Sequence, residues 1–317
     1  MSIAASKTSP SLWHPGEVAL QRSVGAAERM EVVGHRVVRD FMPAQHRDFF
    51  AQQPFLALGA VDGEGNAWAT LVAGPPGFVS SPDARSLRVM CPRDARDPAD
   101  AGLNDGDAVG LLGIELHSRR RNRMNGAVRR EDAAGFTVAV EHAFGNCPQY
   151  IQQREVQLAG APGSPGDVRR MQCLDARARE MIRGADTFFV ASYVDREEGV
   201  RQVDISHRGG RAGFVRISED DTLTIPDFAG NLHFNTLGNL RENPRAGLVF
   251  VDFATGDLLQ LTGAAEVILD SPEIAAFAGA ERLWRVSPRI IVLRERALPL
   301  RWAFTHWSPH TLRTGSW

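Results

Sequence analysis

Short apolar runs, separated by clusters of turn residues, are the main pattern along this chain. The runs are about five to eight residues long, and turn clusters such as residues 62–66 and 208–210 interrupt them. The run at 246–253 alternates too little between apolar and polar residues for a half-exposed strand. It favours strands that are buried in a closed barrel. The pattern therefore predicts a mainly β protein of the α+β class.

Helices are expected on either side of the first set of strands. Residues 17–39 carry spaced apolar positions, which predicts one or two amphipathic helices that pack on a barrel. The Gly- and Pro-rich stretch 160–166 is expected to be a linker. Asp167 can cap a helix that follows this linker, and Gly184 can end it.

Four motifs of the first half recur in the second half. Runs 55–62, 77–79, 110–115 and 126–127 resemble runs 188–195, 213–215, 247–252 and 263–264. The separation grows from 133 to 137 residues along the chain, as insertions in loops would cause. This length suits a repeated domain rather than a solenoid unit, so we expect two homologous barrels in tandem. Chance similarity between short apolar strands is the alternative.

Composition and charge narrow the classes of function. The chain has 317 residues, of which 36 are basic and 38 acidic, so no global field attracts nucleic acid or anionic lipid. Three scattered cysteines lack the spacing of a disulfide framework or a zinc site, and we expect no metal and a reducing, cytoplasmic setting. No window approaches the roughly 18 apolar residues of a membrane helix.

The first candidate site is the arginine-rich run at 118–126. On a strand, Arg119, Arg121 and Arg123 project from the same face. Three guanidiniums on one face repel each other unless an anion joins them, and arginine presents a planar fork to phosphate or carboxylate. The alternative is a solvated hairpin whose charges are balanced by nearby acids.

The second candidate is the run at 204–216. It combines a hydroxyl, an imidazole and three guanidiniums with glycines that let backbone N–H groups approach a ligand, as a phosphate site requires. The residues are Ser206, His207, Arg208, Arg211 and Arg216. Ser206 and His207 face opposite ways on a strand and cannot act as a pair, so no catalytic residue is identified. An ordinary β-turn with a surface histidine is the alternative.

The third candidate is the run at 225–244, where polar residues lie among phenylalanines. Such a mixture suits a ligand with an apolar ring and polar edges. The polar residues include Asn231, Asn235, Thr236 and Asn239. They could instead serve as helix caps; Asn235 or Thr236 could cap a short helix, whose start is itself an anion site.

These runs resemble the pyridoxamine 5′-phosphate oxidase-like, FMN-binding split-barrel family. The resemblance is carried by residues 211–250 and 263–266, and the FGNCPQYI segment at 144–151 is similar to one in two-barrel members. The first copy resembles a more diverged example. The resemblance implies tandem split β-barrels with flanking helices. The implied domains are an N-terminal helical arm (1–45), a first barrel (46–155), a linker and helix (156–185) and a second barrel (186–317).

The resemblance also implies an FMN site. Family members hold the flavin phosphate with basic residues at Arg-x4-Lys spacing, which falls on Arg211 and Arg216 with arginine in place of lysine. The lysine of the following turn falls on Thr236 and its basic neighbour on Asn235. Family barrels pair to bind flavin between them, and the glutamine that a partner barrel supplies falls on Arg121 in the first copy. The two copies would then form an internal pseudo-dimer.

The implied function is that of an FMN-dependent oxidoreductase or electron-transfer flavoprotein. Its partner would be a small-molecule substrate or a redox protein, and an external reductase would supply electrons because no reductase module is recognised. The family also allows a homodimer, coenzyme F420 or haem in place of FMN, and a non-catalytic flavin- or ligand-binding barrel. Nucleic-acid binding through the arginine run is disfavoured by the acidic pI near 6.5.

Overall fold

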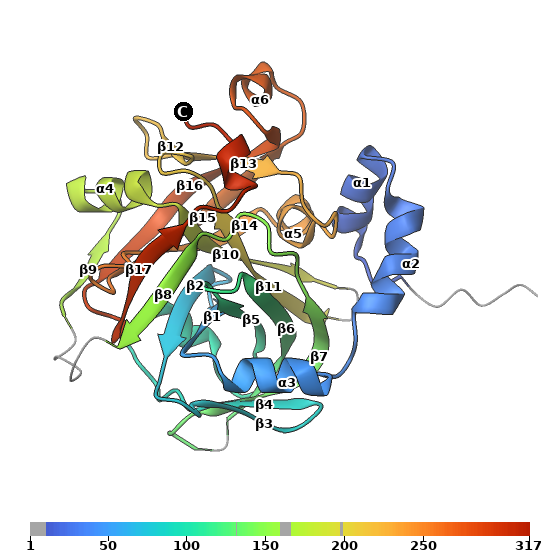
Figure 1. The fold of residues 1–317 in the computed structure, drawn as a ribbon, viewed down its shortest axis with the longest axis vertical. Helices are drawn as coiled ribbons and strands as arrows, with labels where there is room; N and C mark the ends of the chain where they lie inside the picture. Colours follow the sequence, from blue (N-terminus) through green and yellow to red (C-terminus); the bar gives the residue numbers. More distant parts are fainter. Residues whose placement is uncertain (1–10, 131, 159–165, 197–198) are drawn as a thin grey trace, which may run out of the picture.

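The fold consists of two antiparallel barrel sheets packed against each other (Figure 1). The structure is a computed structural model and describes residues 11–130, 132–158, 166–196 and 199–317. The seven-stranded sheet contains β1 (Phe55–Val61), β2 (Ala67–Ala73), β3 (Val79–Asp83), β4 (Ser86–Val89), β5 (Ala108–Glu115), β6 (Arg120–Arg129) and β7 (Phe136–Gly145). The eight-stranded sheet contains β9 (Val168–Met171), β10 (Thr187–Asp195), β11 (Arg201–Gly209), β12 (Arg216–Ile217), β13 (Leu223–Phe228), β14 (Arg245–Val251), β15 (Leu258–Ile268) and β16 (Ala280–Arg294). A two-stranded ribbon pairs β8 (Gln153–Leu158) with β17 (Leu300–His306). The two large sheets confirm the prediction of tandem barrels.

Helices flank both sheets, as predicted. They are α1 (Pro15–Ser23), α2 (Ala27–Val37), α3 (Ala44–Ala51), α4 (Ala176–Gly184), α5 (Asn235–Glu242) and α6 (Pro272–Ala276), with short 3-10 helices η1 (Pro98–Gly102) and η3 (Thr311–Arg313). The prediction that Asp167 caps a helix is wrong, because the chain enters β9 at that point. Asp175 caps α4 instead by accepting a hydrogen bond from the backbone N–H of Ala178 at 2.8 Å. The predicted linker lies, except for Gly166, outside the described residues.

The two sheets repeat the same strand order. The first reads β2-β1-β5-β6-β7-β4-β3 and the second reads β11-β10-β14-β15-β16-β13-β12. The repeat extends to a bulge, since the register shifts at Gly126 in β6 and at Gly263 in β15. A Cβ atom on these glycines would lie 1.9 Å and 2.0 Å from a backbone carbonyl oxygen. Both copies therefore exclude a side chain at the same place.

Strand pairing corrects the sequence alignment of the repeat by one residue. Gly59 lies opposite Gly110, and Ala191 lies opposite Gly247. Gly59 therefore corresponds to Ala191, whereas the alignment of the first strands was one residue out of step. Nearly every residue of these two strands is buried, so no alternation of polar and apolar positions marks the phase.

The barrels contact each other reciprocally. A Cβ atom on Gly110 of β5 would lie 2.8 Å from the carbonyl oxygen of Val203 in β11. A Cβ atom on the equivalent Gly247 of β14 would lie 2.3 Å from that of Ala67 in β2. Because each barrel presents the same strands to the other, the chain forms an internal pseudo-dimer with an approximate twofold axis.

The N-terminal arm is anchored to the second barrel. Helices α1 and α2 stand beside α5 in Figure 1, and α1 contacts α5 where two glycines meet. A Cβ atom on Gly16 would lie 2.3 Å from the carbonyl oxygen of Gly238. This close approach brings α1 to the start of α5. No helix among the described residues is long and apolar enough to cross a membrane.

Candidate functional site

A pocket of about 120 Å³ lies in the seam between the barrels. Its walls come from β6 and the segment after β7 on one side, and from β11, the loop after β13 and the start of α5 on the other. Eight predicted residues line it: Arg121, Arg123, Ser206, His207, Arg208, Asn231, Asn235 and Thr236. The sequence therefore identified both walls of one crevice.

Arg121 is a buried cation in the wall of the pocket. Its Nε donates to the carbonyl oxygen of Cys147 at 2.8 Å, and its guanidinium donates to Nδ1 of His207 at 3.3 Å. No carboxylate among the described residues forms an ion pair with it. Burial lowers the pKa of Arg121, but a guanidinium stays protonated in proteins. The pocket therefore holds an uncompensated positive charge.

His207 offers a second donor. Because Nδ1 accepts from Arg121, the neutral ring carries its proton on Nε2, and this buried atom has no hydrogen-bond partner within the described part of the chain. The residue is 5% exposed, and burial together with Arg121 and Arg208 lowers its pKa well below 6.5. The imidazole therefore stays neutral and can donate to a ligand acceptor.

Arg123 joins the two barrels. Its guanidinium donates to Asp204 at 3.0 Å and to Oδ1 of Asn235 at 2.9 Å, and it also bonds the hydroxyl of Ser206. Both Arg123 and Asp204 are almost fully buried. Arg123 of the first barrel therefore contacts three polar side chains of the second barrel.

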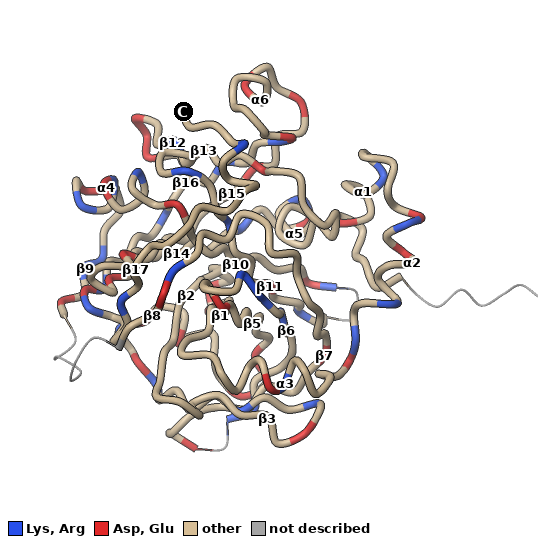
Figure 2. The backbone as a smooth tube through the Cα atoms, in the orientation of Figure 1, with Lys and Arg blue, Asp and Glu red and all other residues tan. Residues whose placement is uncertain are grey.

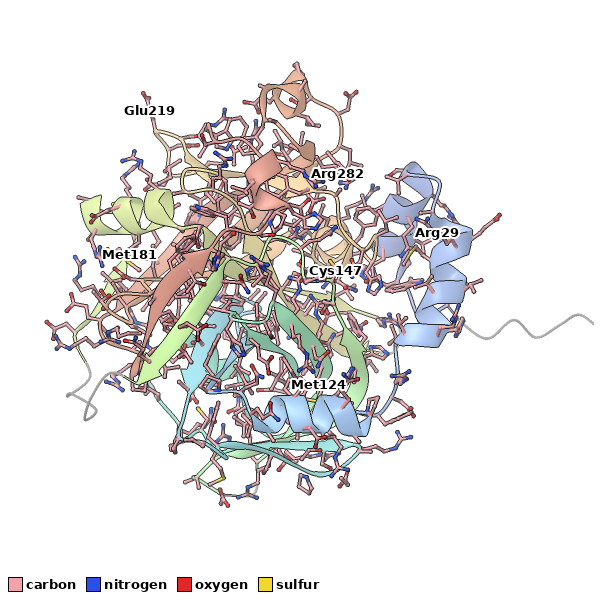
Figure 3. The ribbon with its side chains drawn as sticks, in the orientation of Figure 1. Arg29, Met124, Cys147, Met181, Glu219 and Arg282 are labelled. Atoms are coloured by element: carbon pink, nitrogen blue, oxygen red, sulfur yellow. The ribbon has the colours of Figure 1, made fainter. Side chains whose placement is uncertain are left out.

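Arg208 and Arg282 share one carboxylate. Asp227 accepts from Arg208 at 2.6 Å and from Arg282 at 3.0 Å, and Arg282 also pairs with Glu281 at 2.5 Å. Arg282, labelled in Figure 3 with Cys147, reaches the pocket from β16. Sequence reasoning missed Arg282 because strand pairing alone brings it beside β13.

The four pocket arginines exceed their acidic partners by one charge. Arg123 is paired with Asp204, while Arg208 and Arg282 are paired with Asp227 and Glu281. The excess charge is that of Arg121. Figure 2 shows basic positions along β6 and β11 at the centre of the molecule. The site therefore favours an anion although the whole chain has a net charge of −2.

The start of α5 adds backbone donors. Phe234 precedes the helix with a φ of 58°, and none of the side chains that the structure describes caps the helix. Asn235 and Thr236 lie in the first turn, so the prediction that one of them caps the helix is wrong. Uncapped N–H groups and the helix dipole favour an anion at this end.

Cys147 also lines the pocket. The side chain is half-buried in the pocket wall, and its Sγ lies 3.7 Å from a guanidinium nitrogen of Arg121. Its carbonyl oxygen holds Arg121 in place. No group of three or more His, Cys, Asp or Glu side chains suited to a metal occurs in the described ranges.

Arg119 does not share the face of Arg121. Strand β6 begins at Arg120, and Arg119 precedes it in a turn with a φ of 59°. Its Nε donates to the carbonyl oxygen of Ile151 at 2.9 Å. The prediction of three arginines on one strand face is therefore wrong, because the turn rotates the first of them out of the ladder.

Arg211 and Arg216 also lie outside the pocket lining. Arg211 donates to the carbonyl oxygen of Leu312 at 3.0 Å. Arg216 pairs with Glu273 at 2.7 Å and stacks 4.1 Å from the centre of the Trp317 ring. The residues that keep the family's Arg-x4-Lys spacing are thus engaged near the C-terminal segment.

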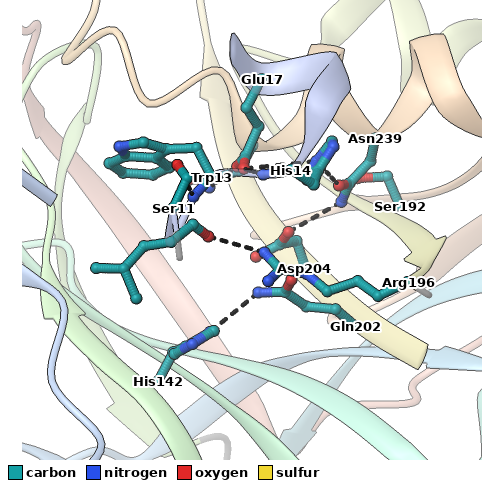
Figure 4. A network of polar contacts seen from close by, with 12 residues as sticks. Ser11, Trp13, His14, Glu17, His142, Ser192, Arg196, Gln202, Asp204 and Asn239 are labelled. Atoms are coloured by element: carbon teal, nitrogen blue, oxygen red, sulfur yellow. Dashed lines mark hydrogen bonds and ion pairs between the residues drawn. The ribbon is translucent and has the colours of Figure 1, made fainter. Parts of the chain in front are cut away.

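Asn239 belongs to a polar network behind the pocket (Figure 4). Its amide nitrogen donates to Asp204 at 2.9 Å, and its oxygen accepts from Nε2 of His14 at 2.8 Å. Glu17 accepts from the amide of Asn235 at 2.6 Å. The arm was expected only to pack on a barrel, yet it supplies two side chains that hold pocket residues in place. The only signal of His14 and Glu17 in the sequence is their spacing of three residues, which suits a capping box at the start of α1.

Both arm residues have displaced pKa values. Burial, with a contribution from the charge of Asp204, raises the pKa of Glu17 to about 8. Burial also lowers the pKa of His14 to about 4. The two groups lie 3.6 Å apart. Near pH 6 they are therefore neutral hydrogen-bonding groups rather than an ion pair.

Glu17→Gln is expected to flatten the loss of stability between pH 6.5 and pH 8. The raised pKa means that folded Glu17 holds a proton which the unfolded chain releases, so wild-type stability falls as pH rises toward about 8. The lowered pKa of His14 acts only below about pH 6.5. Between pH 6.5 and pH 8 the wild type should lose at most about 2 kcal/mol more unfolding free energy than the variant, at 1.36 kcal/mol per pH unit. Urea unfolding of both proteins at pH 6.5, 7.5 and 8.5 measures it; parallel profiles would contradict the assignment.

The comparison with known families agrees with this geometry. Residues 174–299, which hold most of the second barrel, match the family described as pyridoxamine 5′-phosphate oxidase. The second barrel is therefore similar to the barrel of the pyridoxamine 5′-phosphate oxidase-like family. The resemblance inferred from the sequence is therefore confirmed. The barrel that matches the family supplies α5 and β11 to the pocket, and the first barrel supplies β6.

Solved split-barrel structures resemble parts of the chain. HupZ of Group A Streptococcus is 17% identical, covers 37% of this chain and 91% of its own, and has a TM-score of 0.29. An FAD-binding protein from Mesorhizobium loti is 14% identical and covers 40% and 97%, with a TM-score of 0.27. HutZ, the heme storage protein from Vibrio cholerae, is 16% identical and covers 38% and 95%, with a TM-score of 0.26. No curated protein matches the chain.

Proposed function

We propose that the seam pocket binds the phosphate end of FMN and that the protein is an FMN-dependent oxidoreductase or electron-transfer flavoprotein. The observation that carries the proposal is a cluster of donors. Within the described part of the chain, buried Arg121 has no acidic partner, Nε2 of the adjacent His207 has no hydrogen-bond partner, and no side chain caps the start of α5. These groups are all donors, and together they match a phosphate dianion. When bound, the flavin would supply the redox chemistry, while the protein would orient it.

The energetics of these donors support a phosphate ligand. Hydrogen bonds to charged groups contribute roughly 1.5–3 kcal/mol each, so three such donors offset much of the desolvation of a phosphate. The pocket, at about 120 Å³, is smaller than the roughly 300–1,000 Å³ of sites that enclose a whole ligand. The phosphate and part of the ribityl chain would be enclosed, and the ring would lie toward the pocket mouth.

Purified protein tests the proposal directly. The expected result is a flavin absorption spectrum, with FMN identified by mass spectrometry of the released cofactor. Dithionite or NAD(P)H should bleach the absorption, and air should restore it. A colourless protein that gains no absorption after incubation with FMN and gel filtration would contradict the proposal. If the released cofactor is FAD or F420, the identification of the cofactor as FMN is wrong, but the assignment of the binding site stands.

A second candidate is a non-catalytic barrel that binds a flavin or another anionic ligand. The observation that favours it is the placement of Arg211 and Arg216, which keep the family's basic spacing but are held by Leu312 and Glu273. A bound flavin that is not reduced by any tested donor protein or nicotinamide would support this candidate.

The cellular setting and partners belong to the same proposal. The three cysteines are free, which supports a reducing, cytoplasmic compartment. A small-molecule substrate or a redox protein, with an external reductase, would complete the reaction. The internal pseudo-dimer supplies both walls of the site within one chain, so a homodimer is not required for it.

A further inference from the structure

The internal repeat produces a second pocket related to the first. It is lined by β2, the loop after β4 with the start of η1, and the segment after β16. These elements are the counterparts of β11, the loop after β13 with the start of α5, and the segment after β7, which line the first pocket. The approximate twofold axis therefore relates the two pockets.

Strand pairing identifies the equivalent residues. Gly59 pairs with Ala69, and its counterpart Ala191 pairs with Ile205, so Thr70 corresponds to Ser206. Likewise, Arg123 pairs with Leu112 and Gln260 pairs with Val249 in equivalent strands, so Gln260 corresponds to Arg123. At the helix starts, Asp97 precedes η1 as Phe234 precedes α5.

A carboxylate fills the second pocket at the position of that helix cap. Asp97 accepts hydrogen bonds from Thr70 at 2.5 Å, from Gln260 at 2.9 Å and from Arg294 at 2.7 Å. It also accepts from the backbone N–H of Ala99 at 3.0 Å. The residue is 7% exposed. A hydroxyl, a β-strand side chain, an arginine and a helix start thus converge on one resident anion.

The first pocket has no carboxylate at the corresponding helix cap, although Arg123 is paired there with Asp204 of β11. Ser206, Arg123 and the start of α5 occupy the equivalent positions, and Phe234 stands in place of the aspartate. We propose that Asp97 occupies, in the second pocket, the place that a ligand's anionic group takes in the first. The chain then binds one phosphate-class anion, and removal of the Asp97 carboxylate creates a second site for the same class.

The charges of the second pocket support this assignment. Its lining has three arginines and three aspartates: Arg93, Arg96, Arg294, Asp94, Asp97 and Asp100. Without Asp97 the arginines exceed the aspartates by one, which is the same excess that Arg121 gives the first pocket. Because Arg294 is 7% exposed, an oxyanion that replaces the carboxylate would be held by a desolvated cation.

Asp97→Ser tests the inference with inorganic phosphate as the probe. Serine keeps an oxygen that can cap η1 but removes the charge and leaves room for an anion. Isothermal titration of wild-type protein should give one phosphate per chain, and the variant should give two. Phosphate should also raise the midpoint of thermal unfolding of the variant by several degrees more than that of the wild type. Two phosphates on wild-type protein, or no gain in the variant, would overturn the inference.

Two controls define the new site. Asp97→Asn removes the charge but keeps the volume, so it should gain little phosphate binding. The double variant Asp97→Ser with Arg294→Gln should lose the added phosphate. The statement that wild-type protein binds one phosphate rests on the proposed function. The statement that removal of the Asp97 carboxylate creates a further site does not. A wild-type protein that binds no phosphate, with one gained by Asp97→Ser, would therefore refute only the phosphate site of the first pocket.

A reciprocal variant covers the case in which Asp97→Ser fails to fold. Phe234→Asp places a carboxylate at the equivalent position of the first pocket, where aspartate tolerates the left-handed backbone. Compared with the neutral control Phe234→Asn, it should weaken phosphate binding by at least about tenfold, which is the change expected when a like charge adds about 1.4 kcal/mol. Equal affinities of these two variants would count against the equivalence.

Discussion

Arg123→Met is expected to lower the free energy of unfolding by about 3–5 kcal/mol, because it breaks a buried ion pair and leaves one charge behind. Asp204 would keep its bonds from Asn125 at 2.7 Å and Asn239 at 2.9 Å, but it would lose its only cationic partner in the described structure. Asn235 and Ser206 would lose the same donor. Since these partners belong to the second barrel, the variant should weaken the seam between the barrels.

Urea unfolding of wild type, Arg123→Met, Asp204→Asn and the double variant measures this effect. The double variant leaves no unpaired charge, so it should be more stable than Arg123→Met alone. A loss below about 1 kcal/mol in Arg123→Met is typical of an exposed pair and would show that the buried pair does not hold the seam together.

Arg121→Met is expected to have the opposite profile, with a large loss of ligand affinity and little loss of stability. Arg121 has no acidic partner among the described residues, so its removal leaves no carboxylate unpaired and relieves a desolvated cation. One lost charge-assisted hydrogen bond of roughly 1.5–3 kcal/mol corresponds to about 10- to 150-fold weaker FMN binding. Quenching of flavin fluorescence during titration of apoprotein measures the affinity.

Arg211→Met is the matched control for this variant. It removes the same side-chain charge from a residue that keeps the family's basic spacing but donates outside the pocket, to Leu312. Its FMN affinity should stay within about threefold of wild type, a difference of less than about 0.7 kcal/mol. If Arg211→Met loses affinity and Arg121→Met does not, the phosphate lies at the sequence-predicted arginines and the seam pocket is not the site.

The contrast between these two arginines also shows the limit of motif reasoning. The spacing of Arg211 and Arg216 resembles the family's phosphate motif, yet the fold engages both with the C-terminal part of the chain. The run at 118–126 was equally compatible with a solvated hairpin. Arg121 and Arg123 of this run became pocket residues because β6 lies against β11 of the other barrel.

Local sequence patterns indicated the barrel strands, the repeat and eight of the residues that line the pocket. Apolar runs and turn clusters act over a few residues, and a duplicated domain repeats them at a nearly constant separation, so they can be recognised without contacts. The equivalence of Gly59 and Ala191 could not be recognised in this way. Their strands are almost uniformly buried, so no alternation of polar and apolar residues shows which positions correspond.

Only the tertiary structure determines which charged side chains pair across the seam between the barrels. Whether an arginine meets a carboxylate depends on which strands lie opposite each other, and Asp204, Asp227 and Arg282 are far apart in sequence from most of their partners. Likewise, burial rather than residue type made Glu17 a neutral hydrogen-bonding group and left Arg121 uncompensated. Composition counts charges, but desolvation and distance decide which of them remain available to a ligand.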